Sequence, residues 1–381
     1  MHVSKPLLVI GTRPEAIKMW PVVKECTASP EISPVICFTG QHRELLNQAA
    51  EYFELTPDIN LDAMRKNQSL AELASRCISG IDKAIAEKHC DSVIAQGDTT
   101  TTMSASLASF YRQVPFVHIE AGLRTGNLHA PWPEEYHRRL ITTATQLHCA
   151  PTPKAAQNLL HEGVEANRIH VTGNTVIDCL LWTRSREILA TAPWEEKYRW
   201  LANQKMVLIT AHRRENQGPI FEQILTAIFR LATKFPNIHF LYPLHLNPHI
   251  SKPATERLSA LTNVHLTPPA TYPEFVWLME RSTLILTDSG GVQEEAPTLK
   301  KPVVVLRDTT ERQEVVENGS VILAGTCSEN IFESVSTLLT NKKSYARCQE
   351  ADNPYGDGRA SERIVRLLCG RKVDQFHPIA A

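Results

Sequence analysis

Acidic and basic side chains are concentrated in the stretch HIEAGLRTGNLHAPWPEEYHRR, which covers residues 118–139. Glu120 comes directly after an apolar run, and Glu134 and Arg138 are four residues apart, which places them on one face of the helix expected after the second proline. A solvated loop with a surface ion pair can have this composition. A site that moves a proton beside an anionic leaving group requires this mixture of charges, because carboxylates transfer the proton and cations stabilise the departing anion.

Further charged side chains follow apolar runs that have the composition of buried strands. Asp98 follows SVIAQ, Arg13 and Lys18 follow PLLVIG, and His212 follows VLIT. Because parallel sheets bind ligands at the carboxyl ends of their strands, we expect Asp98 to lie beside Glu120 and Glu134. Structural interpretations stay open: Asp98 as a cap over the threonine run, Glu120 as a carboxylate holding loop amides, the two cations as a solvated helix start, and His212 as a structural histidine.

The stretch TDSGGVQEEAP has the form of an anion site. A strand ends, two glycines turn the chain, and a helix begins. Free backbone N–H groups at the helix start attract phosphate, Gly290 and Gly291 allow close approach, and Ser289 adds a hydroxyl. Glu295, about one turn into the helix, is placed to hold a ribose diol. The alternative is an ordinary strand–helix turn with serine as the N-cap, because the stretch is neither a Walker sequence nor GxGxxG.

Several other kinds of chemistry lack support. We expect neither a metal nor an organic cofactor, since no CxxC, HxxxH or clustered Asp/His pattern is present and GDTTTT offers one acid. There is no nucleophile elbow. A net charge of −1, without a basic stripe, argues against nucleic acid, and no apolar run is long enough to span a membrane. Nine scattered cysteines and an N-terminus without a leader-like segment predict a reduced, cytoplasmic protein.

Apolar runs alternate with helical segments along the whole chain, which indicates parallel sheets covered on both faces. A polar connector with two exposed-looking tryptophans, at about 188–205, separates two such series. We therefore expect an α/β protein of two Rossmann-like doubly wound domains facing a central cleft. Residues 1–187 form the domain with the acids and 188–360 the nucleotide-binding domain, and a terminal helix and tail, 361–381, packs back on the first. The expected strands are 6–11, 34–40, 91–98, 114–122, 146–152, 168–174, 206–212, 238–245, 263–269, 282–291, 302–308 and 320–325.

Nine motifs follow one another along the chain: GTRPEAIKMWPVV, TGQHRELL, GDTTTTMSASLASFY, the 118–139 stretch, VTGNTVID, TAHRRENQG, YPLHLNP, LTDSGGVQEEAPTLKKPVVVLRDTTERQE and NPYGDG. Their order and spacing resemble the non-hydrolysing UDP-N-acetylglucosamine 2-epimerases of bacteria and archaea, over roughly residues 6–370. The resemblance implies the glycosyltransferase-B fold, a homodimer, and interconversion of UDP-GlcNAc and UDP-ManNAc, which supplies ManNAc for cell-surface polysaccharide.

The resemblance also implies roles for individual residues. The catalytic acids are Asp98, Glu120 and Glu134, and the residues around the diphosphate and sugar are Arg13, Lys18, Arg138 and His212. UDP contacts are Phe275 near uracil, Ser289, Gly290 and Gly291 at phosphate, Glu295 at ribose, and Arg312. A second UDP-GlcNAc, acting as an effector, is implied at Gln41, Arg213 and His245. One departure is Gln313, which stands where the family usually has proline.

The implied chemistry is departure of UDP from the anomeric carbon with loss of the C2 proton, which gives a 2-acetamidoglucal. Proton return to the opposite face and re-addition of UDP complete the epimerisation. Acids must therefore reach both faces of C2. The alternatives are a 2-epimerase of a related UDP-diacetamido or uronate sugar, a glycosyltransferase of the same fold, and a nucleotide-sugar sensor without catalysis.

Overall fold

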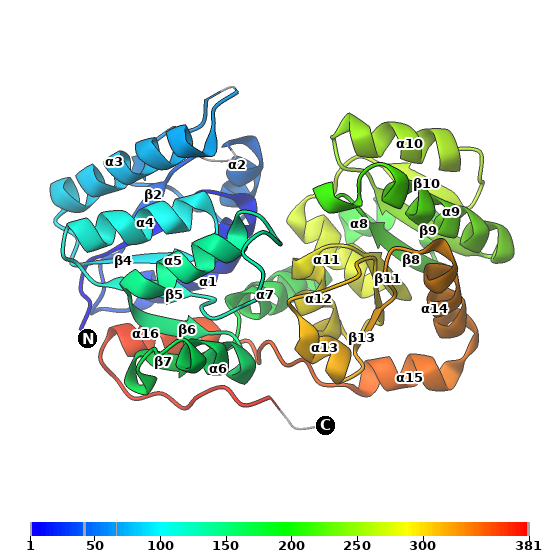
Figure 1. The fold of residues 1–381 in the computed structure, drawn as a ribbon. Helices are drawn as coiled ribbons and strands as arrows, with labels where there is room; N and C mark the ends of the chain where they lie inside the picture. The colour runs from blue at the N-terminus through cyan, green and yellow to red at the C-terminus, as the bar shows by residue number, and fades with distance from the viewer. Residues whose placement is uncertain (1, 41–42, 66, 379–381) are drawn as a thin grey trace. The chain divides into compact units, whose positions relative to one another are not determined.

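The computed structural model describes residues 2–40, 43–65 and 67–378, and the chain divides into two compact units (Figure 1). The first unit is Met1–Cys179 together with Tyr355–Pro378, and the second is Leu180–Pro354. The chain thus returns to the first unit near its end, where Val3 N–H donates to the carbonyl of Leu368 at 2.8 Å. Each unit has its own sheet and its own core.

The sheet of the first unit is parallel throughout, because every strand pair described in it has the same direction. The strand order is β3 (Ile59–Asn60), β2 (Val35–Phe38), β1 (Pro6–Ile10), β4 (Ser92–Gln96), β5 (Phe116–Ile119), β6 (Thr145–Ala150) and β7 (Ile169–Val171). The central strands β1, β4 and β5 are buried along their length, as expected for strands covered on both faces. The short β3 is too brief to leave a sequence pattern and was not predicted.

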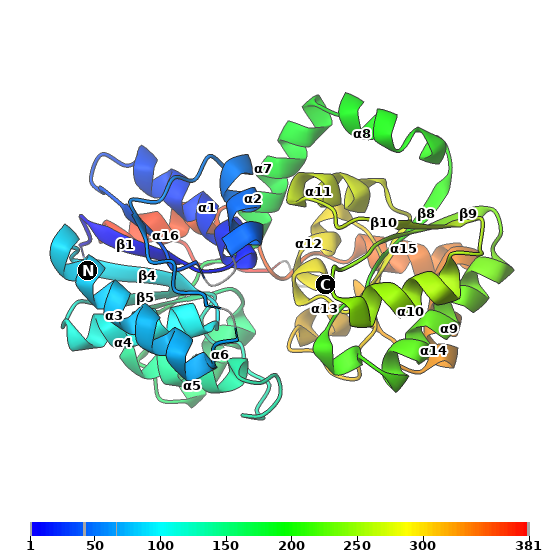
Figure 2. The ribbon, with the colours of Figure 1, turned by 90° about the horizontal axis from the view of Figure 1, so that it is seen from above.

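Helices cover both faces of this sheet (Figures 1 and 2). On one face α3 (Leu70–Lys88), α4 (Thr100–Tyr111) and α5 (Glu134–Ala144) pack side by side. On the other lie α1 (Arg13–Ala28), α2 (Arg43–Tyr52) and α16 (Ala360–Leu368). The buried face of α4 consists of Thr, Ser and Ala, and these small residues let it approach the strand ends closely. The unit also contains α6 (Pro153–His161) and the first part of α7 (Thr175–Leu189).

The second unit repeats this architecture. Its parallel sheet has helices α9, α10 and α14 on one face and α11 and α12 on the other (Figure 2). The strand order is β10 (Val264–Thr267), β9 (Ile238–Pro243), β8 (Lys205–Thr210), β11 (Leu284–Thr287), β12 (Val303–Val305) and β13 (Val321–Leu323). The helices are α9 (Pro219–Lys234), α10 (Pro248–Leu258), α11 (Tyr272–Arg281), α12 (Gly290–Glu295), α13 (Gln313–Glu317), α14 (Ser328–Thr340) and α15 (Lys342–Glu350). The predicted fold class, two doubly wound α/β units, is confirmed.

The predicted connector is more ordered than its composition suggested. It contains the end of α7, α8 (Ala192–Lys197) and a 3-10 turn at Arg199–Leu201. Both tryptophans are half-buried, so the expectation that they are exposed is wrong. Trp194 Nε1 donates to Glu187 at 2.6 Å, and the Trp200 ring packs on the His265 ring with centroids 3.7 Å apart. Aromatic packing of this kind holds the polar segment against its unit.

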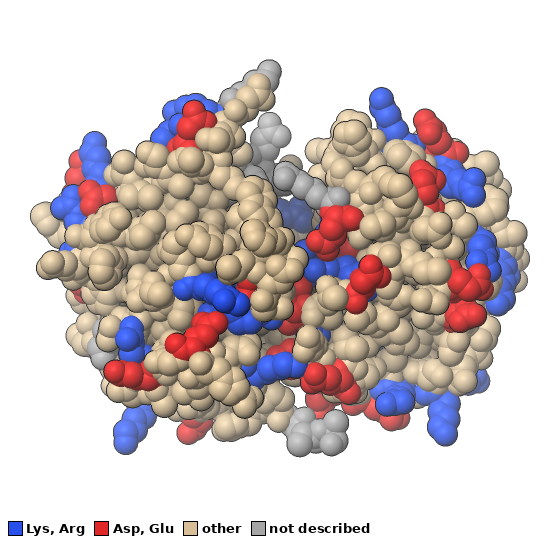
Figure 3. All heavy atoms as spheres, in the orientation of Figure 1, with Lys and Arg blue, Asp and Glu red and all other residues tan. Residues whose placement is uncertain are grey.

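The surface bears mixed charge. On the face drawn in Figure 3, acidic and basic side chains are interspersed over both units and form no large patch of one sign. No helix in the described ranges has the length and apolar content needed to cross a membrane.

Candidate active site

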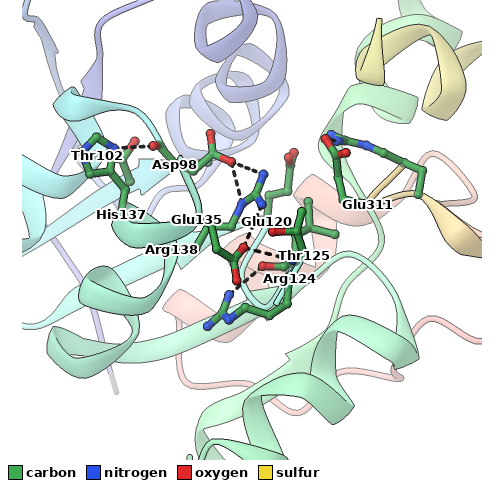
Figure 4. A network of polar contacts seen from close by, with 12 residues as sticks. Asp98, Thr102, Glu120, Arg124, Thr125, Glu135, His137, Arg138 and Glu311 are labelled. Atoms are coloured by element: carbon green, nitrogen blue, oxygen red, sulfur yellow. Dashed lines mark hydrogen bonds and ion pairs between the residues drawn. The ribbon is translucent and has the colours of Figure 1, made fainter. Parts of the chain in front are cut away.

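The three predicted acids come from neighbouring places in the first unit, and Figure 4 shows two of them, Asp98 and Glu120. Asp98 lies just after β4, and Glu120 follows directly on β5, the strand paired with β4 in parallel. Glu134 is the first residue of α5, at the end of the loop that follows Glu120. The carboxyl edge of the sheet therefore gathers these acids, as expected for an open α/β sheet.

Arg138 on α5 holds Asp98 in place. Its Nε and Nη2 atoms lie 2.8 and 2.7 Å from Oδ2 of Asp98, and its Nη1 lies 3.1 Å from Oε2 of Glu135 (Figure 4). The sequence spacing had suggested a pair between Arg138 and Glu134, and the structure corrects this. Glu135 at i−3 is fully buried and takes that place. The suggestion that Asp98 caps the next helix is also wrong, because Thr99 is the N-cap of α4.

Glu134 has a different environment from its neighbour. It is half-buried, and within the described ranges its Oε2 atom is enclosed without a hydrogen-bond partner. A carboxylate oxygen in this situation loses hydration without compensation, and a bound ligand with a donor group would satisfy it. Glu134 therefore presents an oxygen to a ligand at the edge of the acid group.

Glu120 is fixed by three side chains that converge on one oxygen. Its Oε2 accepts from Lys18 Nζ at 2.5 Å, from Gln96 Nε2 at 3.0 Å and from Asn174 Nδ2 at 3.2 Å. The backbone of Glu120 has a φ of +66°, a conformation that costs on the order of 1–3 kcal/mol for a residue with a side chain. Lys18 is buried against this acid, so its interpretation as part of a solvated helix start is wrong.

Three residues that the sequence analysis did not select anchor the backbone around the acids. Glu135 accepts from the amides of Thr125 and Gly126, at 3.1 and 3.3 Å. His118 Nε2 lies 2.7 Å from the carbonyl oxygen of Gly97, and His137 Nδ1 lies 2.8 Å from that of Asp98. Since a carbonyl oxygen only accepts, His118 carries a hydrogen on Nε2 and His137 carries one on Nδ1.

The charge state of His118 fits this anchoring role. Burial lowers the pKa of His118 to about 4, so the ring is neutral near pH 7. His118 and His137 both lie in the charged stretch, residues 118–139. That position was the available signal for a role at the site, but a backbone carbonyl partner that is distant in sequence leaves no sequence pattern.

In the second unit, the ends of β8 and β11 are tied together by Asp288. Its Oδ2 accepts from the amides of His212 and Arg213, at 2.8 and 2.9 Å, and from Asn216 Nδ2 at 3.1 Å. The His212 ring is partly exposed and stacks on the His245 ring, with centroids 5.5 Å apart and planes 10° apart. Asp288 belongs to the DSGG motif, and the sequence analysis missed its anchoring role.

The predicted phosphate turn lies beside a buried arginine. Ser289 occupies the N-cap position of α12 but makes no capping hydrogen bond through its side chain. A Cβ atom on Gly290 would lie 2.9 Å from Cζ of Arg312, so any other residue there would push the guanidinium of Arg312 away from the turn. At Gly291 the nearest atoms to a Cβ are at 3.8 Å or beyond, which leaves room over the turn.

Buried acids hold Arg312. Its Nε and Nη2 atoms lie 2.9 and 2.7 Å from Oε1 of Glu294, and its Nη1 contacts Glu311. Although burial acts in the opposite direction, the guanidiniums of Arg312, Arg307 and Arg213 hold the pKa of Glu311 well below its usual range. The cluster thus brings three cations to the strand ends near the turn.

The remaining predicted residues are placed as follows. Glu295 is buried and accepts from the Tyr272 hydroxyl at 2.7 Å, and Phe275 is half-buried on α11. Arg13 begins α1 and is half-buried, and Gln313 begins α13 directly after Arg312. Gln41 lies outside the described residues. Across the described part of the chain, no group of three His, Cys, Asp or Glu side chains is arranged to hold a metal ion.

Known proteins resemble this chain over almost its whole length. The family model for UDP-N-acetylglucosamine 2-epimerase matches residues 24–369. A UDP-N-acetylglucosamine 2-epimerase of Yersinia pestis is 48% identical over 373 residues, which are 97% of this chain and 99% of that protein. The crystal structure of the Neisseria meningitidis UDP-GlcNAc 2-epimerase bound to UDP-GlcNAc has a TM-score of 0.93 at 47% identity, covering 96% of this chain and 100% of that one. The Methanocaldococcus jannaschii UDP-GlcNAc 2-epimerase in complex with UDP-GlcNAc and UDP has a TM-score of 0.82 at 33% identity, covering 96% and 99%.

Proposed function

The chain belongs to the UDP-N-acetylglucosamine 2-epimerase family, and we propose from this that it interconverts UDP-GlcNAc and UDP-ManNAc by inverting C2 of the sugar. The observation that carries the proposal is the group of acids at the ends of β4 and β5, in a chain that is nearly half identical to such enzymes. The reaction requires groups that take a proton from carbon and return it to the other face, and this part of the first unit supplies carboxylates.

The hydrogen on C2 is hardly acidic in the intact substrate, because no carbonyl is attached to that carbon. The bond from C1 to the diphosphate oxygen therefore breaks with or before proton removal, and UDP leaves with the electron pair. A carboxylate takes the C2 proton, and the C1–C2 double bond forms. In the second half, a carboxylic acid protonates C2 on the opposite face, and the diphosphate oxygen of UDP attacks C1.

We assign the proton transfers to Asp98, Glu120 and Glu134. The enclosed oxygen of Glu134 and the buried position of Glu120 support direct contact with the reacting carbon. Arg138 and Lys18 fix the two acids that they pair with, so that small displacements do not take these carboxylates out of reach.

We assign UDP binding mainly to the second unit. The phosphate turn is formed by Ser289, Gly290 and Gly291, and Arg312 lies over its first glycine. Glu295 takes the ribose hydroxyls, and Phe275 lies against uracil. Arg13 and His212 stabilise the charge that develops on the departing diphosphate.

Four further assignments follow the family resemblance and are open to test. We propose a cytoplasmic homodimer whose product supplies ManNAc for cell-surface polysaccharide. A second UDP-GlcNAc acts as an effector near Arg213 and His245, with Gln41 as a third contact. The stacked rings of His212 and His245 support this, because they connect the proposed effector residues with a proposed substrate residue.

The direct test is incubation with UDP-GlcNAc alone in deuterated water. The wild type should incorporate deuterium at C2, form UDP-ManNAc and release a little UDP and glycal. Asp98→Asn and Glu120→Gln should lower exchange by at least about 100-fold while UDP affinity, measured by calorimetry, stays within a few-fold. Asp82→Asn is the matched control, because Asp82 also pairs with an arginine, Arg112, but on the surface.

The outcomes separate the alternatives. Exchange with a UDP-diacetamido or uronate sugar, but not with UDP-GlcNAc, identifies a related 2-epimerase. UDP-GlcNAc binding without exchange, unchanged in Asp98→Asn, identifies a sensor. Absence of exchange together with sugar transfer to an added acceptor identifies a glycosyltransferase.

A further inference from the structure

Glu15 on α1 is a buried carboxylate that the chemistry above does not use. Its side chain is enclosed at the carboxyl edge of the first sheet, and the residue is only 2% exposed. One oxygen, Oε2, accepts from the amides of Gly11 at 2.5 Å and Thr12 at 2.9 Å. The other, Oε1, accepts from the hydroxyl of Thr99.

Part of this arrangement is ordinary helix capping, since Thr12 and Glu15 form a capping box. The same motif at the start of α3, formed by Ser69 and Glu72, provides a comparison. Glu72 is exposed, and hydrogen bonds from Ser69 lower its pKa. Burial raises the pKa of Glu15 to about 7, with the charge of nearby Asp98 contributing. Capping therefore works with an exposed acid, and the burial of Glu15 has a separate reason.

Glu15 differs from Glu72 in its bond from Thr99, whereas the hydrogen bonds described for Glu72 come from Ser69 of its own capping box. Gly11 and Thr12 lead into Arg13, and Thr99 comes directly after Asp98. The strands before them, β1 and β4, are adjacent in the sheet. One carboxylate thus joins the turn that carries a proposed diphosphate contact to the turn that carries a proposed catalytic acid.

The turns around this link have little freedom to move. A Cβ atom on Gly11 would lie 2.1 Å from Oγ1 of Thr101, and the Thr101 hydroxyl lies 2.9 Å from that of Thr39. From the other side, His137 binds the carbonyl of Asp98. Because these contacts hold each turn as a unit, the Glu15–Thr99 bond fixes the placement of one turn relative to the other.

We propose that Glu15 is a positioning residue, which through Thr99 sets the placement of Asp98 relative to Arg13. The inference rests on the proposed function. Its consequence is kinetic, because displacement of a reacting group by about 1 Å can cost about 100-fold in rate. Loss of the link should lower kcat and leave ground-state binding of the nucleotide sugar largely unchanged.

The test measures kcat and KM for deuterium exchange in Glu15→Met, Thr99→Ala, the double variant and Thr99→Ser, because methionine keeps the length of the side chain and cannot accept from or donate to Thr99. Both single variants should lose at least about tenfold in kcat with KM within about threefold. The double variant should be no worse than about twofold below the poorer single one, because both changes remove the same link. Thr99→Ser keeps the hydroxyl and should stay within about twofold of the wild type.

Two controls remove capping without touching the site. Glu72→Met breaks the exposed capping box of α3, and Thr152→Ala removes the N-cap of α6, which accepts from the amide of Ala155 at 3.1 Å. Both should keep kcat within about twofold. The inference is overturned if Thr99→Ala and Glu15→Met retain kcat, if only KM changes, or if the controls lose as much. If the wild type shows no exchange, the proposed function itself is overturned. If the wild type is active and the variants are unaffected, the positioning role of Glu15 is overturned and the proposed function stands.

Discussion

Replacement of Lys18 by methionine should destabilise the first unit, because it leaves the carboxylate of Glu120 buried without its cation. The two charged atoms are 2.5 Å apart, and the side chains of Lys18 and Glu120 are 9% and 6% exposed. Methionine keeps most of the length and apolar volume of lysine, so the change removes the charge with little effect on packing.

The size of the effect can be worked from this geometry. At an effective dielectric constant of about 20, two unit charges at this separation attract by about 7 kcal/mol, most of which offsets the cost of taking both out of water. Removal of one partner of a buried pair costs about 3–5 kcal/mol. Because Gln96 and Asn174 still donate to Glu120, we expect the lower value, about 3 kcal/mol, at pH 7.

Hydrogen exchange of β5 amides, followed by mass spectrometry, reports on the first unit by itself. Glu120→Gln in the Lys18→Met background should recover about 2 kcal/mol relative to the sum of the single changes. Lys83→Met is the control, because Lys83 pairs with Glu87 at 3.6 Å on the surface of α3, and it should cost about 0.5 kcal/mol or less. Additivity of the two buried changes within about 0.5 kcal/mol, or an equal loss in the control, would refute the reasoning.

Arg138→Lys should lower kcat for exchange by about tenfold or more with a smaller effect on KM, because lysine cannot contact Asp98 through two nitrogens while also reaching Glu135. Steady-state exchange kinetics would measure this, and an unchanged kcat would contradict it. The pKa of Glu15 is raised from 4.5 to about 7, so its contribution to the free energy of unfolding should fall by about 3 kcal/mol as pH rises through that window. The difference in the free energy of unfolding between the wild type and Glu15→Gln, measured by denaturation at several pH values, should show this fall. A difference independent of pH would show that Glu15 does not titrate there. The pH dependence of the stability that Glu311 contributes should have the opposite sign. The pKa of Glu311 is held low, so its contribution to the second unit should be present above about pH 4.5 and lost in more acidic solution. Hydrogen exchange of β12 amides should show this loss in the wild type and not in Glu311→Gln.

The layers of the fold followed from local patterns in the sequence. Continuous apolar runs such as VLIT, separated by segments of helical period, are enough to specify parallel strands covered on both faces. The position of Asp98 and Glu120 also followed, because a polar residue directly after such a strand reaches the carboxyl edge of the sheet wherever the helices pack. The short β3 and the packing of Trp194 and Trp200 escaped prediction, since neither depends on periodicity.

The tertiary structure alone decided which charged groups meet. Helical spacing placed Arg138 on a face with Glu134, but burial selected Glu135 at i−3, and a strand end 40 residues earlier supplied Asp98 as the second partner. In the same way Lys18 pairs with Glu120, 102 residues later, and Glu15 accepts a hydrogen bond from Thr99, 84 residues later. Periodicity reports the environment of one segment, whereas the partner of a buried charge depends on which segments the sheet order makes adjacent. The sequence by itself therefore determined the kinds of groups at the site and the edge of the sheet that carries them, and the fold determined their pairing.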